Sequence, residues 1–258
     1  MTLQQTIENV NKQGGQAFIP YIMAGDGGLE TLRETILRLQ QIGATAIEVG
    51  IPFTDPVADG PTIEAAGMRA LANGVNLTNV LATLKSFASD VSIPLVIMTY
   101  LNPILAYGAE VFAKDAKDAG VRGVIVPDMP MEESDIIHDA LKTHQLALVQ
   151  LVSLTSPPER IAKLAAASEG FVYAVTVNGI TGARSSFATN LEQHFKALKD
   201  VSNVPVLAGF GISTPEHVQQ FANICDGVIV GSKIVDCIQQ EDWNSIEALI
   251  HSAKKLEV

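Results

Sequence analysis

Residues 204–232 read VPVLAGFGISTPEHVQQFANICDGVIVGS, and this stretch contains one complete strand–helix–strand unit. Its two ends, VPVLAGF and DGVIVGS, are short and largely apolar, which is typical of strands buried on both faces of a parallel sheet. Between them, Thr214-Pro215-Glu216 is a helix-opening sequence with proline in the first turn. Because strands joined through a helix run parallel, the stretch predicts a sheet built from βαβ units.

Six further apolar runs of the same kind precede this unit. Amphipathic stretches separate them; Leu32, Ile36 and Leu39, for example, recur at helical spacing. Two additional helices are expected, one near residues 3–11 and one near residues 61–73. The six runs are AFIPYIMAG from residue 17, AIEVG from residue 46, PLVIMTY from residue 94, VRGVIVPD from residue 121, LALVQLVS from residue 146 and FVYAVT from residue 171.

The eight runs together predict eight parallel strands. Eight strands can close into a barrel without an exposed edge, and the 258 residues match the roughly 250 that such a domain needs. We therefore expect an α/β fold, a single-domain (β/α)8 TIM barrel over residues 1–258 with an extra N-terminal helix. An open doubly wound sheet is the alternative, since it also uses βαβ units.

Composition and charge narrow the classes of partner. A net charge of −11 argues against nucleic acid, although a small anion can still bind in a locally positive pocket. No apolar run reaches the roughly 18 residues that span a membrane, and the first residues, MTLQQTIENVNKQ, lack the apolar segment of a signal peptide. Cys225 and Cys237 fit buried thiols in a reducing compartment, so a cytoplasmic protein is expected.

Two loops near the end of the chain are rich in small residues. The seventh run continues as Gly209-Phe210-Gly211-Ile212-Ser213, and the eighth ends in Gly231-Ser232 immediately before a helix. Glycines let backbone N–H groups approach an anion, the following helix adds partial positive charge, and barrels often bind phosphate at these two loops. The sequence therefore predicts a phosphate site here, with Lys233 as a candidate for additional charge. Tight turns without a ligand are the alternative.

Carboxylates follow the second run. Glu48 lies between Ile47 and Val49, so it should point into the barrel while these neighbours pack against helices. An inward carboxylate without a partner is costly, which favours a catalytic role over a structural ion pair. Asp55 and Asp59 follow in a loop with three prolines. As alternatives to a functional role, Asp55 could be a turn residue and Asp59 could be a helix cap.

Four segments carry a resemblance to a known family. IEVGIPFTDPVADGPTI (47–63), VPDMPMEES (126–134), NGITGAR (178–184) and AGFGIS (208–213) resemble the tryptophan synthase alpha family, and the likeness extends over nearly the whole chain. The resemblance implies a lyase of L-tryptophan biosynthesis that splits indole-3-glycerol phosphate into indole and glyceraldehyde 3-phosphate by retro-aldol chemistry. It implies no metal or organic cofactor in this chain. It also implies an α2β2 complex with a beta subunit that carries pyridoxal phosphate and receives the indole directly.

The resemblance also implies roles for individual residues. Glu48 would be the principal acid–base group, and Asp59 would accept a hydrogen bond from the indole N–H. The chain departs from other members at Tyr21, where many have Phe, at Pro127, where some have Ala, and at Val177, where well-known bacterial members have Arg. The implied substrate-binding residues are Tyr21, Met98, Tyr100, Ile125, Pro127, Tyr173, Thr181 and Phe210, and the implied phosphate-binding residues are Gly182, Gly211, Gly231 and Ser232.

Other functions remain open at this point. A Schiff-base aldolase would need a lysine inside the barrel, but none of the eight runs contains one. A metal-dependent aldolase would need ligand spacing, which the five histidines lack. A non-catalytic scaffold that only activates a partner, and a lyase that works without a partner, are further alternatives.

Overall fold

The computed structural model describes residues 1–175, 185–209 and 211–254 of the chain. Its centre is a sheet of eight parallel strands that closes into a barrel, because β8 pairs with β1 as well as with β7. Each of the eight apolar runs contains one strand, so the predicted barrel is confirmed and the open sheet is wrong. The strands are β1 (Ala17–Met23), β2 (Ile47–Gly50), β3 (Leu95–Met98), β4 (Val121–Ile125), β5 (Ala147–Ser153), β6 (Val172–Val175), β7 (Val206–Gly209) and β8 (Gly227–Val230).

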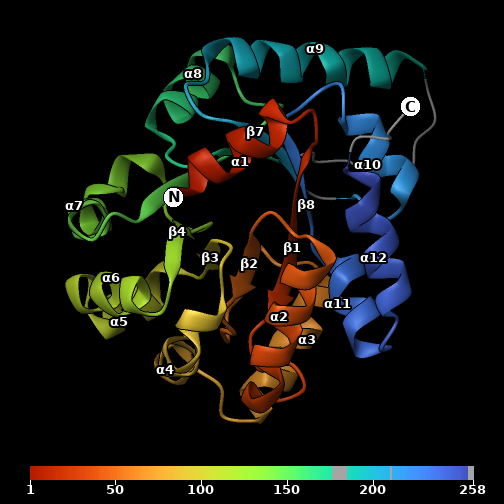
Figure 1. The fold of residues 1–258 in the computed structure, drawn as a ribbon. Helices are drawn as coiled ribbons and strands as arrows, with labels where there is room; N and C mark the ends of the chain where they lie inside the picture. The colour runs from red at the N-terminus through yellow and green to blue at the C-terminus, as the bar shows by residue number, and fades with distance from the viewer. Residues whose placement is uncertain (176–184, 210, 255–258) are drawn as a thin grey trace.

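Helices surround this barrel (Figure 1). Both additional helices predicted from the sequence are present, as α1 ahead of the first strand and α3 after the second. Three short 3-10 helices, residues 29–31, 88–90 and 131–133, lie in the loops. The α-helices are α1 (Leu3–Lys12), α2 (Leu32–Ile42), α3 (Pro61–Ala72), α4 (Leu77–Ser86), α5 (Leu101–Tyr107), α6 (Ala109–Asp118), α7 (Asp135–Thr143), α8 (Pro158–Ala167), α9 (Ser185–Val201), α10 (Pro215–Phe221), α11 (Ser232–Gln239) and α12 (Trp243–Ser252).

The apolar side chains form an inner and an outer core. Ile47 and Val49 belong to the outer core between the strands and the helices, as the alternation around Glu48 predicts. Ile19, Val96 and Leu207 belong to the inner core within the barrel. Both cores consist mainly of closely packed aliphatic side chains, with a few ring contacts such as Phe171–Tyr173 and Phe195–Phe221.

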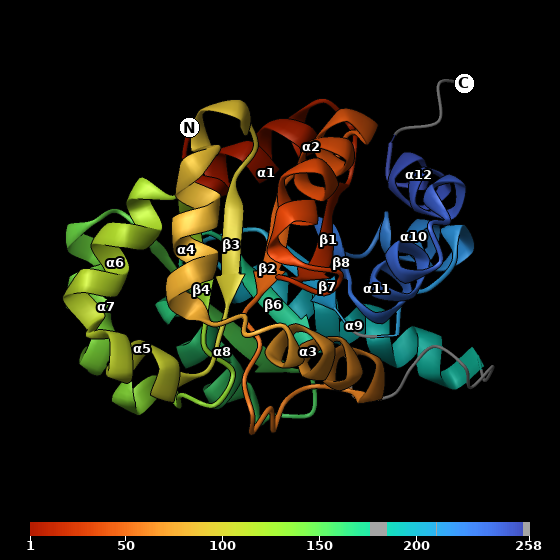
Figure 2. The same ribbon diagram turned by 90° about the horizontal axis from the view of Figure 1, so that it is seen from below.

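The helix α1 lies across the amino end of the barrel, while α3 lies at the carboxyl end (Figure 2). Thr2 begins α1 with a capping box, in which its hydroxyl accepts from the Gln5 N–H and the Gln5 side chain accepts from the Thr2 N–H. Leu3 and Ile7 of α1 are buried in the inner core with Phe171. The helix therefore seals one end, and the opposite end is left for the loops after the strands.

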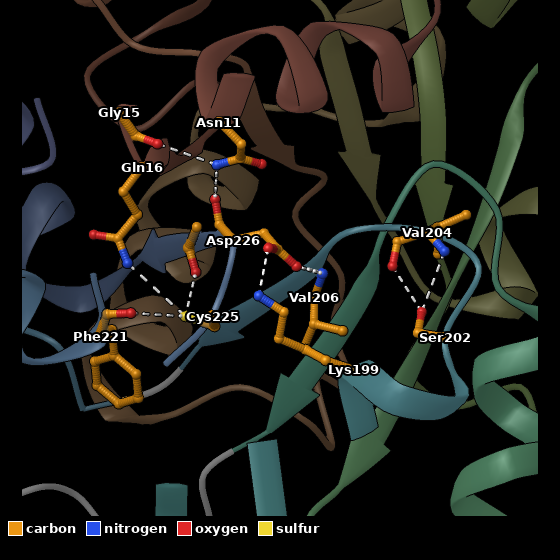
Figure 3. Close-up of polar contacts among 11 residues, drawn as sticks. Asn11, Gly15, Gln16, Lys199, Ser202, Val204, Val206, Phe221, Cys225 and Asp226 are labelled. Carbon is orange, nitrogen blue, oxygen red and sulfur yellow. Dashed lines mark hydrogen bonds and ion pairs between the residues drawn. The ribbon is translucent and has the colours of Figure 1, made fainter. Parts of the chain in front are cut away.

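Asp226 joins the first and last parts of the chain at the same amino end (Figure 3). Its carboxylate accepts from the Lys199 Nζ at 2.7 Å and from the Val206 N–H at 2.8 Å. Its carbonyl oxygen accepts from the Asn11 side chain at 2.7 Å and from the Ala17 N–H at 3.1 Å. One residue thus holds α1, β1, α9 and β7 where the barrel closes.

The two cysteines are buried free thiols, as the composition predicts. Burial is the main cause that raises the pKa of Cys225 to about 12, which keeps this thiol protonated. In the described part of the chain, every helix is too short or too polar to cross a membrane.

Candidate active site

A cavity of about 360 Å³ opens among the loops that follow the strands. It brings together side chains from β1, β2, β3 and β6 with the loops after β2, β7 and β8. Eight of the residues expected to bind or react line it: Tyr21, Glu48, Asp59, Met98, Tyr173, Gly211, Gly231 and Ser232. The remaining lining residues are Ala58, Gly60, Ile63, Ile212, Ser213, Ile229 and Lys233.

Glu48 is at the inner wall of the cavity, on β2. It pairs in register with Tyr21 of β1, so the two side chains point to the same side of the sheet. Only 1% of Glu48 is exposed, and its Oε2 atom is fully buried with no hydrogen-bond partner among the residues that the structure describes. Burial, and secondarily the negative charge of Asp59, raise the pKa of Glu48 to about 8. The group is therefore mostly protonated at neutral pH and can both give and take a proton.

Asp59 is held by Tyr100 rather than used as a helix cap. Gly60 is the N-cap of α3, so the cap interpretation of Asp59 is wrong. The Tyr100 hydroxyl donates to Asp59 Oδ1 at 2.8 Å and accepts from the Ala58 N–H at 3.1 Å. The Tyr100 ring also packs against Phe53, with centroids 5.3 Å apart. Burial raises the pKa of Asp59, and the hydrogen bond from Tyr100 lowers it.

Two glycines make room for the two tyrosines of the cavity. A Cβ atom on Gly50 would collide with the Tyr21 hydroxyl, and one on Gly209 would collide with the Tyr173 ring. Burial is the largest cause that raises the pKa of both phenols, with the charge of Glu48 adding to it. Both tyrosines therefore stay neutral beside the carboxyls.

The other end of the cavity is formed by the loops after β7 and β8. Gly211 has a φ of 77°, a left-handed conformation that glycine adopts without strain. Gly231 is the N-cap of α11, and Ser232 is the first residue of that helix, so the free N–H groups of its first turn lie at the cavity. Lys233 adds a positive side chain to this wall. The arrangement has the donors and charge that an oxyanion needs.

Three of the other expected site residues, Ile125, Pro127 and Tyr100, are described but do not line this cavity. Ile125 is fully buried in the inner core, and Pro127 lines a separate cavity formed by the loop after β4, strand β5 and helix α8. Tyr100 contacts Asp59 and Ala58. Thr181, Gly182 and Phe210, together with Val177 and Arg184, lie outside the described residues. The main cavity is also lined by three residues that were not predicted, Ile63, Ser213 and Ile229. Of these, Ile229 could have been found from the sequence, because side chains alternate along a strand and its position on β8 faces the barrel interior.

Comparisons with known proteins identify a family for this chain. The sequence profile of the family described as tryptophan synthase alpha chain matches residues 7–258. The chain belongs to this family. A relative from Bacillus cereus with that name is 50% identical over 253 residues, which is 98% of each chain. The family's reaction, the cleavage of indole-3-glycerol phosphate, is therefore the reaction of this chain, which is a lyase of tryptophan biosynthesis.

Solved structures show the same fold. Tryptophan synthase from Mycobacterium tuberculosis superposes with a TM-score of 0.90 at 34% identity and covers 98% of each chain. Tryptophan synthase subunit alpha from Campylobacter jejuni gives a TM-score of 0.84 at 35% identity and covers 93% of this chain and 96% of its own. At these levels of identity the chain shares both the fold and the family of these structures.

Tyr100→Phe is expected to lower kcat for indole release on the order of tenfold, since a hydrogen bond to a charged group contributes about 1.5–3 kcal/mol. The ring can still pack against Phe53, so the loss is confined to the hydroxyl. Because that hydroxyl lowers the pKa of Asp59, its removal should move the acidic limb of the pH–kcat profile to higher pH. Tyr107→Phe is the matched control, because the Tyr107 hydroxyl makes the same 2.8 Å bond to Asp115 away from the cavity. An unchanged rate and an unmoved acidic limb in Tyr100→Phe would show that Tyr100 does not position Asp59.

Proposed function

We propose that Glu48 is the acid–base group of the lyase reaction and that Asp59 is its electrostatic partner. The observation that supports this most strongly is the buried Glu48 carboxyl, which shares one cavity with Asp59 and with the loops around Gly211 and Gly231. Because its pKa is about 8, Glu48 populates both the protonated and the ionised form near neutral pH. A purely structural carboxyl would be expected to have a cation beside it.

The proton movements balance within this assignment. The protonated Glu48 gives its proton to the indole ring carbon that carries the glycerol phosphate chain. The resulting carboxylate then takes the proton of the adjacent side-chain hydroxyl while the carbon–carbon bond breaks and an aldehyde forms. Indole and glyceraldehyde 3-phosphate leave, and Glu48 is protonated again. One carboxyl with a raised pKa can therefore serve both steps.

Asp59 has a complementary task in this proposal. Protonation of the ring carbon puts positive charge on the ring nitrogen, and a carboxylate that accepts the N–H hydrogen bond stabilises that charge. Tyr100 holds one Asp59 oxygen at 2.8 Å, which leaves the other for the ring. The charge of Asp59 also raises the pKa of Glu48, so the two carboxyls favour different protonation states.

We further propose that the phosphate binds at the Gly211 and Gly231-Ser232 end and that the ring lies between Tyr21, Met98 and Tyr173. These apolar and aromatic side chains occupy the Glu48 end of the cavity, whereas backbone donors and Lys233 occupy the other. The two ends match the two halves of the substrate, an apolar ring and a dianion. Thr181, Gly182 and Phe210 remain candidates to complete this site.

Residues 1–258 are proposed to form one domain that works in the cytoplasm with a beta subunit, as an α2β2 assembly. Pyridoxal phosphate would belong to that subunit. The loop that carries Asp59 also carries Val57, an apolar side chain that is 81% exposed. A single exposed apolar side chain is common on protein surfaces, so Val57 serves here as a position at which the contact can be tested. A partner that orders this loop would place Asp59 and raise the fraction of competent molecules without adding a catalytic group.

The test is to measure indole release by the chain alone and with its cognate beta subunit, together with sedimentation of the mixture. Association with a rise in kcat is expected, and Val57→Asp should reduce both. Val201→Asp is the matched control, because Val201 is 43% exposed on α9 and far from this loop in the fold. Association without a gain in rate, or no association, would favour a lyase that works alone. Equal losses in the two variants would show that the contact is elsewhere.

A further inference from the structure

A second large cavity, of about 580 Å³, lies at the amino end of the barrel. It is bounded by the start of α1, the ends of α6 and α7, and the first residues of β4 and β5. The candidate active site opens at the other end, beyond the carboxyl ends of the strands. The two cavities therefore cannot share a small ligand.

Three cationic side chains line the amino-end cavity: Lys117, Arg122 and Lys142. In the part of the chain that the structure describes, none of the three has an ion-pair partner. Glu169 is the one carboxylate in the lining, and both of its oxygens are occupied. Its Oε1 is 3.1 Å from the His138 Nε2, and its Oε2 accepts from the Leu148 N–H at 3.0 Å.

Two other lysines close to this region do have a carboxylate partner. The chain has 28 acidic and 17 basic residues, so carboxylates outnumber cations. Lys85 and Lys114, for example, both pair with Asp118 at the end of α6, one helical turn from Lys114. Lys117 lies on the same helix and points instead to the Gln145 side chain, whose oxygen accepts from Nζ at 3.3 Å.

Helix dipoles explain only part of the cluster. Lys117 and Lys142 lie in the last turns of α6 and α7, where positive charge is favourable. Arg122 is on a strand, however, so no helix end accounts for its presence. Its Nη1 donates to the Val121 carbonyl at 2.9 Å, and its other N–H groups have no acceptor among the residues that the structure describes, so they can bind a ligand.

The positive charge of one of these side chains also shifts the pKa of another. Burial, and then the positive charge of Arg122, lower the pKa of Lys117. Like charges placed together without a counter-charge disfavour each other, and an anion between them would remove this cost. Arginine matches the geometry of oxyanions with paired N–H donors, and lysine adds a mobile point charge.

We propose that this cavity binds a small oxyanion with at least two negative charges, through Arg122, Lys117 and Lys142. Phosphate esters and polycarboxylates share this chemistry, and both are small enough for the cavity. The rest of the lining has no charged side chains apart from Glu169, so the ligand would be held by charge rather than by apolar contact.

The experiment is isothermal titration of the full chain with pyrophosphate and, separately, with citrate at low ionic strength. The Ser232→Asp background removes anion binding at the candidate active site. One equivalent should bind in this background, and Lys117→Gln with Arg122→Gln should weaken binding on the order of tenfold, since each close charge pair contributes about 1 kcal/mol near water. Lys114→Gln is the matched control, because Lys114 is on the same helix but already paired with Asp118. A preference between the two probes identifies the class of ligand.

No binding of either probe in the Ser232→Asp background would overturn the proposal. Equal weakening in Lys114→Gln would overturn it as well, because the effect would then be one of net charge. Circular dichroism checks the fold of each variant. If the double variant does not fold, Lys142→Gln alone, at an exposed position, should still weaken binding by a few fold.

Discussion

Glu48→Gln should reduce kcat for indole release by on the order of 10²–10⁴-fold, the usual range for a positioned acid–base group. The amide has nearly the same shape as the carboxyl but can neither give nor take the proton that the reaction moves. KM should change little, because the phosphate end of the cavity is untouched. Glu247→Gln, an exposed carboxyl on α12, is the matched control for loss of one acidic group. A folded Glu48→Gln protein with the kcat of the parent would refute the assignment.

The same variant should change how stability depends on pH. A carboxyl with a higher pKa in the folded than in the unfolded chain binds its proton more tightly when folded. Its contribution to the free energy of unfolding is therefore fully present below the unfolded pKa of 4.5 and is lost as pH rises to about 8. Relative to the parent, Glu48→Gln should gain stability over this window, on the order of 4 kcal/mol. Urea unfolding at pH 4.5 and pH 8.5 measures the gain, and a constant difference between the two proteins would contradict the raised pKa.

Ser232→Asp is expected to raise KM for indole-3-glycerol phosphate on the order of 10²-fold. The new carboxylate would stand at the first residue of α11 against a dianionic phosphate, and each close pair of charges costs between about 1 kcal/mol in water and 4 kcal/mol near a protein surface. Glu48 and Asp59 are unaffected, so kcat at saturation should fall much less.

Ser232→Asn is the control for this substitution, because it has the same size without the charge. Added salt should reduce the difference between the two variants, since the position is exposed. Equal KM values for Ser232→Asp and Ser232→Asn, at low and high salt, would place the phosphate elsewhere.

The fold was predictable because its signal is local and repeated. Each buried parallel strand leaves an apolar run, and the alternation around Glu48 shows which side chain points inward. The inward orientation of the Glu48 side chain could therefore be predicted from its neighbours Ile47 and Val49, without knowledge of the tertiary structure.

The contacts that hold the site were not predictable in the same way. Tyr100 reaches Asp59 across 41 positions of sequence, and no local pattern reports such a contact. Asp59 was readable as a helix cap because it precedes Gly60-Pro61, yet the backbone makes Gly60 the cap. Ser213 and Ile63 enter the cavity from a loop and a helix whose orientation is set by packing rather than by periodicity.

The closure of the barrel at Asp226 has a consequence for how the chain is made. Asn11 and Asp226 are 215 positions apart, and β1 meets β8 only beside them. During synthesis, the first strand therefore waits until residues 227–230 have left the ribosome before it gains its second neighbour. Bringing such distant segments together is entropically costly and slow. In that interval β1 has an open edge, which is where a nascent chain is most exposed to pairing with another copy of itself.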